Sequence, residues 1–345
     1  MRRRPRHAAD VVGLDIQPGE VVAATVRPDS APTVQRAVST TIEAGLVKEG
    51  EVADVDGLAA ALKALFSSHK LPTRVRVGLA SQRAVMRVID LPPLEDERDI
   101  AAAIRLQAPD HIAMPLEQAV IDHQTLGTVE TPDGRRTRVV VVAAQRDSVS
   151  RLLAALRGAG LRPVGIDLSA FALVRALRDA GGAGAEPVLY ADVAGVTTLA
   201  MARGAACELT RISPVGLEAL TARLAEREGI VLSEARRRLL GYGRDGGADD
   251  EAALAVLDHG LAELADDLRN TIEFHAAHGG GPGAERIVLS GPAATIPGFE
   301  RVLGERVGLP VALAAPASSG DGGLVEVPAT RACVAAGLAF EELAA

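Results

Sequence analysis

The sequence predicts an α/β fold of two related domains, with a small α+β subdomain inserted into the first half. Residues 11–26 and residues 188–201 look like two copies of one unit. Each has an apolar run that ends in Asp, a short turn containing Gly and a second run of strand character. Between them, residues 84–166 follow the pattern strand–helix–strand–strand–helix–strand. The repeated unit indicates a duplication, and the intervening pattern indicates the insert.

The composition is that of a globular protein. The chain has 345 residues, of which 48% are hydrophobic and 24% charged, and this length suits two domains with a large core. A net charge of −8 and 2% aromatic residues argue against nucleic-acid binding. The two cysteines give no disulfide framework and indicate a reducing compartment. The basic start lacks the apolar run of a signal peptide, and the longest apolar runs are strand-length, so no membrane span is expected.

The first domain is expected over residues 10–180, with its insert over about residues 84–166. Outside the insert, apolar periodicity predicts a hairpin over 10–27, a strand over 34–40, a helix over 55–69, a strand over 75–80 and a helix over 169–179. Inside it, the same reading predicts strands over 85–91, 120–126, 137–144 and 161–168, with helices over 95–111 and 148–159. The acidic run at 95–97 fits the start of a helix, where negative charge is favourable.

The second domain is expected over residues 186–330, after a glycine-rich linker at 181–184. Its elements are a hairpin that begins at 188, helices over 216–228, 233–241 and 251–278, a strand over 287–290, a helix over 298–307 and a strand over 310–314. The three central helices form a predicted helical subdomain over about 214–278. A terminal helix over 331–343 is expected to pack back on the first domain.

The two Asp-containing units predict a ligand site between the domains. Asp15 and Asp192 are expected to face each other across the cleft, where two carboxylates can hold Mg²⁺ through water and turn N–H groups can cradle phosphates. A single Asp after a strand is common in turns, so the matched pair carries the prediction. A third motif, a strand followed by a tight turn at Gly291, joins them. Together these features are typical of the actin-like, ribonuclease-H-like duplicated fold.

Other ligand sites are not supported by the sequence. There is no Gly-Lys dipeptide of a P-loop, and no Rossmann fingerprint. His275 and His278 share a helix face, but no third ligand accompanies them, so a metal site there is disfavoured. Ser290 precedes a Gly but lacks the Gly-x-Ser-x-Gly pattern of a hydrolase nucleophile elbow.

With these motifs placed, the chain resembles the PilM family of type IV pilus assembly proteins over about residues 11–343, and the FtsA family more distantly. Four segments outside the nucleotide loops carry the resemblance: PDHIAMPLEQAVID at 109–122, VVVAA at 140–144 with GAGLRP at 158–163, TIEF at 271–274 and VAAGLA at 334–339.

The resemblance implies a cytoplasmic ATP-binding scaffold rather than a metabolic enzyme. Such a scaffold clasps the N-terminal cytoplasmic peptide of PilN in a groove beside the insert, and so sits at the inner face of the cytoplasmic membrane with other proteins of the pilus inner-membrane complex. We expect Ile104, Ile112 and Leu116 to line the groove.

The nucleotide loops depart from the family pattern. The family's first loop reads Asp-Ile-Gly-x-x-x-x-Lys, whereas this chain has Gln17, Pro18 and Val22 at the altered positions. Proline has no N–H to donate to a phosphate, and each lost charge-assisted hydrogen bond weakens ATP binding by about 1.5–3 kcal/mol. The second loop has Ala194 and the third Pro292 in place of glycines.

The residues expected at the nucleotide on this resemblance are Asp15, Gln17, Gly19, Asp192, Gly195, Thr197, Thr198, Glu234, Arg238 and Gly291. Among them, Asp15 and Asp192 would hold Mg²⁺ through water, and Arg238 would replace a family lysine. Catalytic residues are not assigned, because no general base is evident.

Two alternatives to a scaffold stay open. One is an active ATPase or phosphotransferase of the same fold, which needs Asp15 and Asp192 as Mg²⁺ ligands and an additional base. The other is an FtsA-like filament protein of cell division, which predicts an amphipathic membrane helix after the core. The acidic segment 340–345 has no basic face, so direct membrane tethering is disfavoured.

Overall fold

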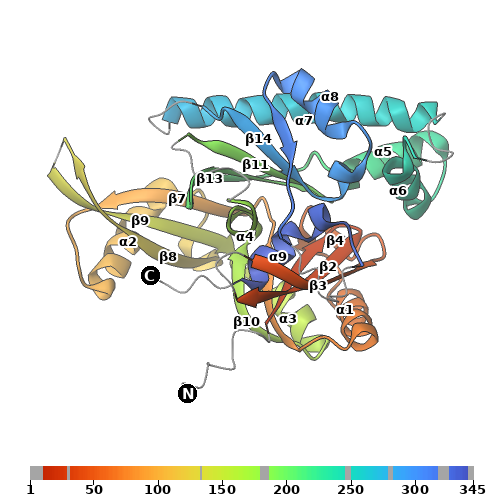
Figure 1. Ribbon diagram of the computed structural model, residues 1–345. Coiled ribbons are helices and arrows are strands. Elements are labelled where there is room, and N and C mark those ends of the chain that lie inside the picture. Colours follow the sequence, from red (N-terminus) through yellow and green to blue (C-terminus); the bar gives the residue numbers. More distant parts are fainter. Residues whose placement is uncertain are drawn as a thin grey trace, which may run out of the picture.

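Three β-sheets and one short ribbon organise the chain in the computed structural model (Figure 1). The structure describes residues 11–28, 32–132, 134–178, 186–244, 250–278, 283–317 and 326–340. The predicted linker at 181–184 and the last residues of the predicted terminal helix lie outside these ranges. Within them, no helix is both long enough and apolar enough to cross a membrane.

The first five-stranded sheet has the order β10-β6-β1-β2-β3. Its strands are β1 (Val12–Gln17), β2 (Glu20–Pro28), β3 (Pro32–Thr41), β6 (Arg74–Leu79) and β10 (Arg162–Leu168). β1 pairs antiparallel with β2 through a two-residue turn, and β1, β6 and β10 are parallel. Pro18 and Gly19 form that turn, where Gly19 adopts φ +82°. Proline followed by a residue with positive φ is typical of a type II turn.

The second five-stranded sheet repeats this order as β13-β12-β11-β14-β15. Its strands are β11 (Val188–Val193), β12 (Thr197–Arg203), β13 (Ala206–Ser213), β14 (Arg286–Ser290) and β15 (Val311–Leu313). In both sheets the order runs third, second, first, fourth and fifth strand, with the same antiparallel and parallel pairings. The two halves of the chain are therefore built on one topology. β13 was not among the predicted elements.

The helices separate and cover the two sheets as layers (Figure 1). On the outer face of the first sheet lie α1 (Val55–His69) and α3 (Arg146–Gly158), whose leucines pack on the even-numbered residues of β1. Between the sheets lie α4 (Ser169–Leu177) and α9 (Cys333–Ala339), which contact residues of both. Over the second sheet lie α5 (Leu217–Glu228), α7 (Glu251–His278) and α8 (Phe299–Val307), with α6 (Leu232–Gly241) beside them.

Helix α9 packs unusually close to its neighbours. A Cβ atom added to Gly13 of β1 would lie 1.9 Å from the carbonyl oxygen of Ala335, and one added to Gly337 would lie 1.9 Å from the carbonyl oxygen of Ala172 in α4. Only glycine permits two backbones to approach this closely. Helix α9 is thereby fixed between the first sheet and α4, and it is preceded by the 3₁₀ turn η3 (Ala329–Ala332).

The insert is an antiparallel sheet of order β7-β9-β8 with one helix on it. Its elements are β7 (Ala84–Leu91), α2 (Glu97–His111), η1 (Leu116–Gln118), β8 (Ala119–Thr131) and β9 (Gly134–Gln145). It forms the separate lobe beside the first sheet in Figure 1. The long hairpin of β8 and β9 projects past the end of β7, because β7 pairs only with residues 137–144 of β9.

The predicted insert boundary at about residue 166 is wrong. The leucines of α3 pack in the core of the first sheet, and β10 pairs in parallel with β6. Parallel neighbours need a crossover connection, and α3 supplies it between β6 and β10. The insert therefore ends with β9, and α3 and β10 complete the first domain. The ribbon of β4 (Val47–Lys48) and β5 (Glu51–Val52), also not predicted, lies against α3.

Candidate functional site

The two predicted loop units meet at the junction of the sheets. The turn after β1 contacts the turn after β11, because a Cβ atom added to Gly195 would lie 2.5 Å from Cδ and 2.7 Å from the carbonyl oxygen of Pro18. A real Cβ atom could not lie this close to another atom, so only glycine fits at position 195. The two turns are therefore packed directly on each other. In this arrangement no phosphate group fits between Pro18 and Gly195.

Asp15 and Asp192 are buried at this junction. Gln17 Nε2 donates a hydrogen bond to Asp15 Oδ1 at 3.1 Å, and Ser290 Oγ donates one to Asp192 Oδ1 at 2.6 Å. Burial, followed by the charge of Asp192, raises the pKa of Asp15 to about 8. Burial also raises the pKa of Asp192 to about 6, although the Ser290 hydrogen bond lowers it. The two carboxyl groups thus interact, and Asp15 keeps its proton at neutral pH.

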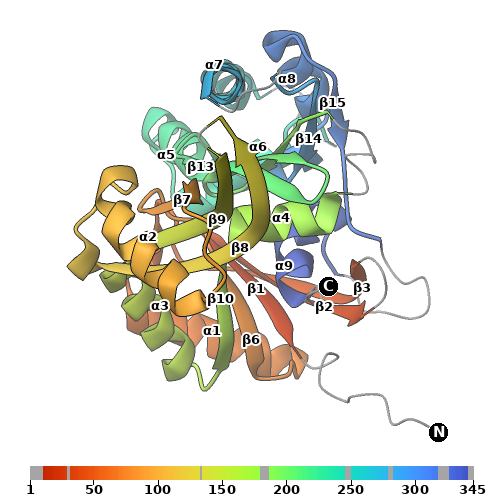
Figure 2. The same cartoon turned by 90° about the vertical axis from the view of Figure 1, so that its left-hand side faces the viewer.

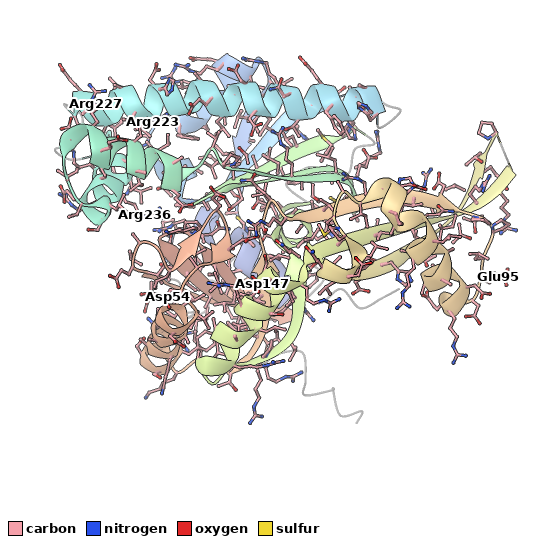
Figure 3. The ribbon with its side chains drawn as sticks, turned by 180° about the vertical axis from the view of Figure 1, so that it is seen from behind. Asp54, Glu95, Asp147, Arg223, Arg227 and Arg236 are labelled. Carbon is pink, nitrogen blue, oxygen red and sulfur yellow. The ribbon has the colours of Figure 1, made fainter. Side chains whose placement is uncertain are left out.

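A third carboxylate, Glu20, lies in the same region and was not predicted there. Glu20 begins β2, and its charge raises the pKa values of both Asp15 and Asp192. Arg236 Nη2 donates to Glu20 Oε2 at 3.3 Å, and Arg331 Nη2 donates to Glu20 Oε1. In Figure 3, Arg236 lies on the side of the α5–α6 region that faces the first half of the chain.

The predicted residues of helix α6 face elsewhere. Arg238 pairs with Asp250 at 2.6 Å and with Glu228 at 3.4 Å, whereas Glu234 binds Arg237 on an exposed face. Successive α-helical residues are rotated by 100°, so residues two apart point to nearly opposite sides. Arg236, two positions before Arg238, is therefore the residue that reaches Glu20 and the Gly19 turn.

Of the other predicted nucleotide residues, Thr197 and Gly291 make hydrogen bonds within the protein. Thr197 Oγ1 donates to the carbonyl oxygen of Val215 at 2.6 Å. Gly291 has φ +92°, and its N–H donates to the carbonyl oxygen of Thr330 at 2.9 Å. Thr198 Oγ1 and Gln17 Oε1 are buried without a hydrogen-bond partner among the described residues.

These residues do not fit Mg²⁺-ATP in this arrangement. The turns that would receive phosphates touch each other, Pro18 has no N–H, and the Gly291 N–H is used by Thr330. The Gln17 amide already binds the Asp15 carboxyl group, which burial keeps protonated.

A separate groove lies between the insert and the first domain. Its volume is about 530 Å³. One wall is the face of β8 and β9 that points away from α2, and the other is formed by β10 and α4; these elements lie together in Figure 2. The lining residues are Leu79, Val120, Asp122, His123, Gln124, Val140, Val142, Ala144, Val149, Ile166, Asp167, Leu168, Phe171 and Arg175.

The insert sheet has two faces with different roles. Strand side chains alternate, and the pairing of Asp122 with Val142 puts even-numbered residues of β8 and β9 on the groove side. The odd-numbered residues, including Val139 and Val141, pack under α2. The groove wall is therefore apolar along β9, while Asp122 adds a carboxylate. On the opposite wall, Arg175 pairs with Asp167 and donates to the carbonyl oxygen of Gly337 at 3.2 Å.

The predicted groove residues belong to the core of the insert instead. Ile104 and Ile112 are only 2% and 3% exposed, and they pack between α2 and the sheet. Leu116 packs against the same cluster. The family resemblance predicts these residues on a binding surface, whereas α2 uses those side chains to cover the odd-numbered face of its own sheet.

Comparison with known proteins identifies similar chains. Sequences described as type IV pilus assembly protein PilM match residues 13–342. A chain solved in a "PilM-PilN type IV pilus biogenesis complex" is 25% identical with a TM-score of 0.80, and the match covers 97% of this chain and 98% of that one.

Two further solved structures show the fold alone. The ethanolamine utilization protein EutJ from Carboxydothermus hydrogenoformans is 16% identical with a TM-score of 0.58, and the match covers 95% of this chain and 88% of that chain. MreB5 of Spiroplasma citri, solved bound to ADP, is 14% identical with a TM-score of 0.50, and the match covers 95% and 94%. These likenesses confirm the predicted actin-like α/β fold.

Proposed function

The chain belongs to the PilM family of type IV pilus assembly proteins, and from this we propose that it is an actin-like scaffold of the pilus inner-membrane assembly complex. Its partner is the N-terminal cytoplasmic peptide of PilN, which it clasps in the groove between the insert and the first domain. The observation that carries the proposal is that groove, because it combines apolar side chains with charged groups at the junction of two sheets.

The walls of the groove suit an extended peptide. β8 and β10 each stand at the edge of their sheet, and along the described residues neither outer edge is paired with another strand. An extended segment can add its backbone hydrogen bonds to such an edge while alternate side chains enter apolar pockets. Val120, Val142 and Phe171 would contact the apolar side chains, and Asp122 and Arg175 would contact polar or charged ones.

The proposal places the protein at the cytoplasmic side of the inner membrane, through its partner and the other proteins of the complex.

The same fold in an active ATPase would depend on Asp15 and Asp192, and ATP turnover lost in Asp15→Ala would favour that function. Sedimentation of polymers would favour the filament alternative. Because the turns at Pro18 and Gly195 pack directly on each other, peptide binding is expected to need neither ATP nor Mg²⁺.

Val120→Asp is expected to weaken binding of the PilN peptide at least tenfold. Val120 is 38% exposed and lines the groove, so a carboxylate there disturbs peptide contacts with little effect on the core. A loss of 1.4 kcal/mol corresponds to the tenfold change. The measurement is a calorimetric titration of the purified variant with a synthetic peptide of the first cytoplasmic residues of PilN.

Val231→Asp is the matched control, because Val231 is also exposed and precedes α6 in the other half of the chain. It should bind the peptide like the unchanged protein. Equal affinity of the Val120→Asp and Val231→Asp proteins would contradict the groove assignment.

Ile104→Asp is expected to lose peptide binding for a different reason. The buried carboxylate would destabilise the packing of α2 on the insert sheet, since an unpaired buried charge is costly. Its thermal transition should therefore shift to lower temperature, while that of Val120→Asp stays near the unchanged value. A stable Ile104→Asp protein that fails to bind the peptide would show that Ile104 contacts the partner and is not a core residue.

A further inference from the structure

One buried carboxylate and two arginines meet at the junction of the two halves. The side chain of Glu20 is only 6% exposed, and those of Arg236 and Arg331 are 12% and 21% exposed. One guanidinium binds each carboxylate oxygen, at 3.3 Å for Arg236. Burial favours the neutral form of Arg236 and lowers its pKa, while Glu20 acts in the opposite sense.

The three residues come from three separate parts of the chain. Glu20 follows the first turn, Arg236 lies in α6 and Arg331 lies in η3, so the contacts span 216 and 311 residues. They join the first sheet to the helical part of the second half and to the segment that leads into α9. The contact is therefore an interdomain one, made where Pro18 and Gly195 already touch.

Two guanidiniums that converge on one anion have the chemistry of a phosphate site. Arginine presents planar N–H donors that match carboxylate and phosphate oxygens equally. Here the chain itself supplies the anion. Asp15 and Asp192 lie close enough for their pKa values to rise in response to Glu20, so an additional polyphosphate would meet a region rich in carboxyl groups.

We propose that Glu20 is a built-in anion that occupies an arginine pair able to bind phosphate, and that this contact holds the two halves closed without nucleotide. It accounts for the direct packing of Pro18 on Gly195, since a charge pair within the chain needs no space for a ligand. Removing the carboxylate would leave two mostly buried guanidiniums unpaired, which is strongly unfavourable.

The test has two parts, of which the first uses the unchanged protein. Calorimetric titration with Mg²⁺-ATP should give no binding at concentrations up to the millimolar range, and the melting temperature should not change. Micromolar binding of Mg²⁺-ATP to the unchanged protein would overturn the proposal. This part does not depend on whether any variant folds.

The second part removes the carboxylate that binds Arg236 and Arg331. Glu20→Gln should melt at a lower temperature than the unchanged protein, and millimolar inorganic phosphate or pyrophosphate should restore much of the loss. The double variant Glu20→Gln with Arg236→Gln should not respond to phosphate. Glu263→Gln, which breaks a pair with Arg223 within the second half, is the control and should not respond either. A Glu20→Gln protein that melts at the same temperature with and without phosphate would also overturn the proposal.

Discussion

Gly337→Ala is expected to lower the free energy of unfolding by about 3 kcal/mol or more, the upper end of the range for overpacking. The new Cβ atom would lie 1.9 Å from the carbonyl oxygen of Ala172 and 2.6 Å from its carbonyl carbon. Both partners are backbone, so no side-chain rotation relieves the overlap and α9 must move away from α4. Because α9 also lies on β1 and belongs to the core between the sheets, the displacement affects both halves. Urea denaturation monitored by circular dichroism gives the free energy.

Gly241→Ala is the matched control for this substitution. Gly241 is the last residue of α6, its φ is not positive, and a Cβ atom there would have no neighbour within 4 Å. Alanine has the higher helix propensity, so this change should be neutral or slightly stabilising, by less than about 1 kcal/mol. Similar free energies for the two variants would show that α9 is not held as closely as the structure has it.

The duplicated fold could be predicted because its signals are local. An apolar run, Asp and a Gly-containing turn occur at residues 11–26 and again at 188–201, and both form the first hairpin of a five-stranded sheet. β13 was missed because it is an edge strand with mixed polarity, including Glu208 and Arg211, and it lacks the continuous apolar run of a buried strand.

The insert boundary could not be predicted from periodicity. The apolar face of α3 fits any sheet, and only the contacts of Leu152 and Leu156 show that it covers the first sheet. The same ambiguity affected the groove. Sequence alternation separates the two faces of β9, but it does not say which face α2 covers. The resemblance alone therefore could not show that Ile104 of α2 lies in the core and not on the groove.

The junction site was predicted in part. Matched motifs identified Asp15 and Asp192, whose charges do interact in the structure. Glu20 gave no signal, because a charged residue after a turn is ordinary. Arg236 was passed over in favour of Arg238, although both lie on one helix, because a sequence does not fix which side of a short helix faces a partner.

Asp15→Asn is expected to make the protein more stable at pH 8, and the gain should shrink as the pH falls. The pKa of Asp15 is raised from 3.8 to about 8 in the folded chain, so between these values the folded state holds one proton more than the unfolded state. Stability then falls with rising pH, by up to about 1.4 kcal/mol for each pH unit, until the pH passes about 8. Asparagine carries no titrating proton, and its Oδ1 can still accept the hydrogen bond from Gln17.

The measurement is the free energy of unfolding of both proteins at intervals from pH 5 to pH 8. The difference between them should grow by about 2 kcal/mol or more between pH 6 and pH 8. Asp90→Asn is the control, since pairing with Arg138 lowers the pKa of Asp90 and its contribution is lost only in acid. A neutral Asp15 is what a closed, nucleotide-independent junction requires, whereas an ionised Asp15 is what a bound cation would require. A loss of stability in Asp15→Asn at pH 8 would therefore contradict the prediction and show that Asp15 is ionised in the folded protein. A loss found only with Mg²⁺ present would show that the ionised carboxylate binds the cation.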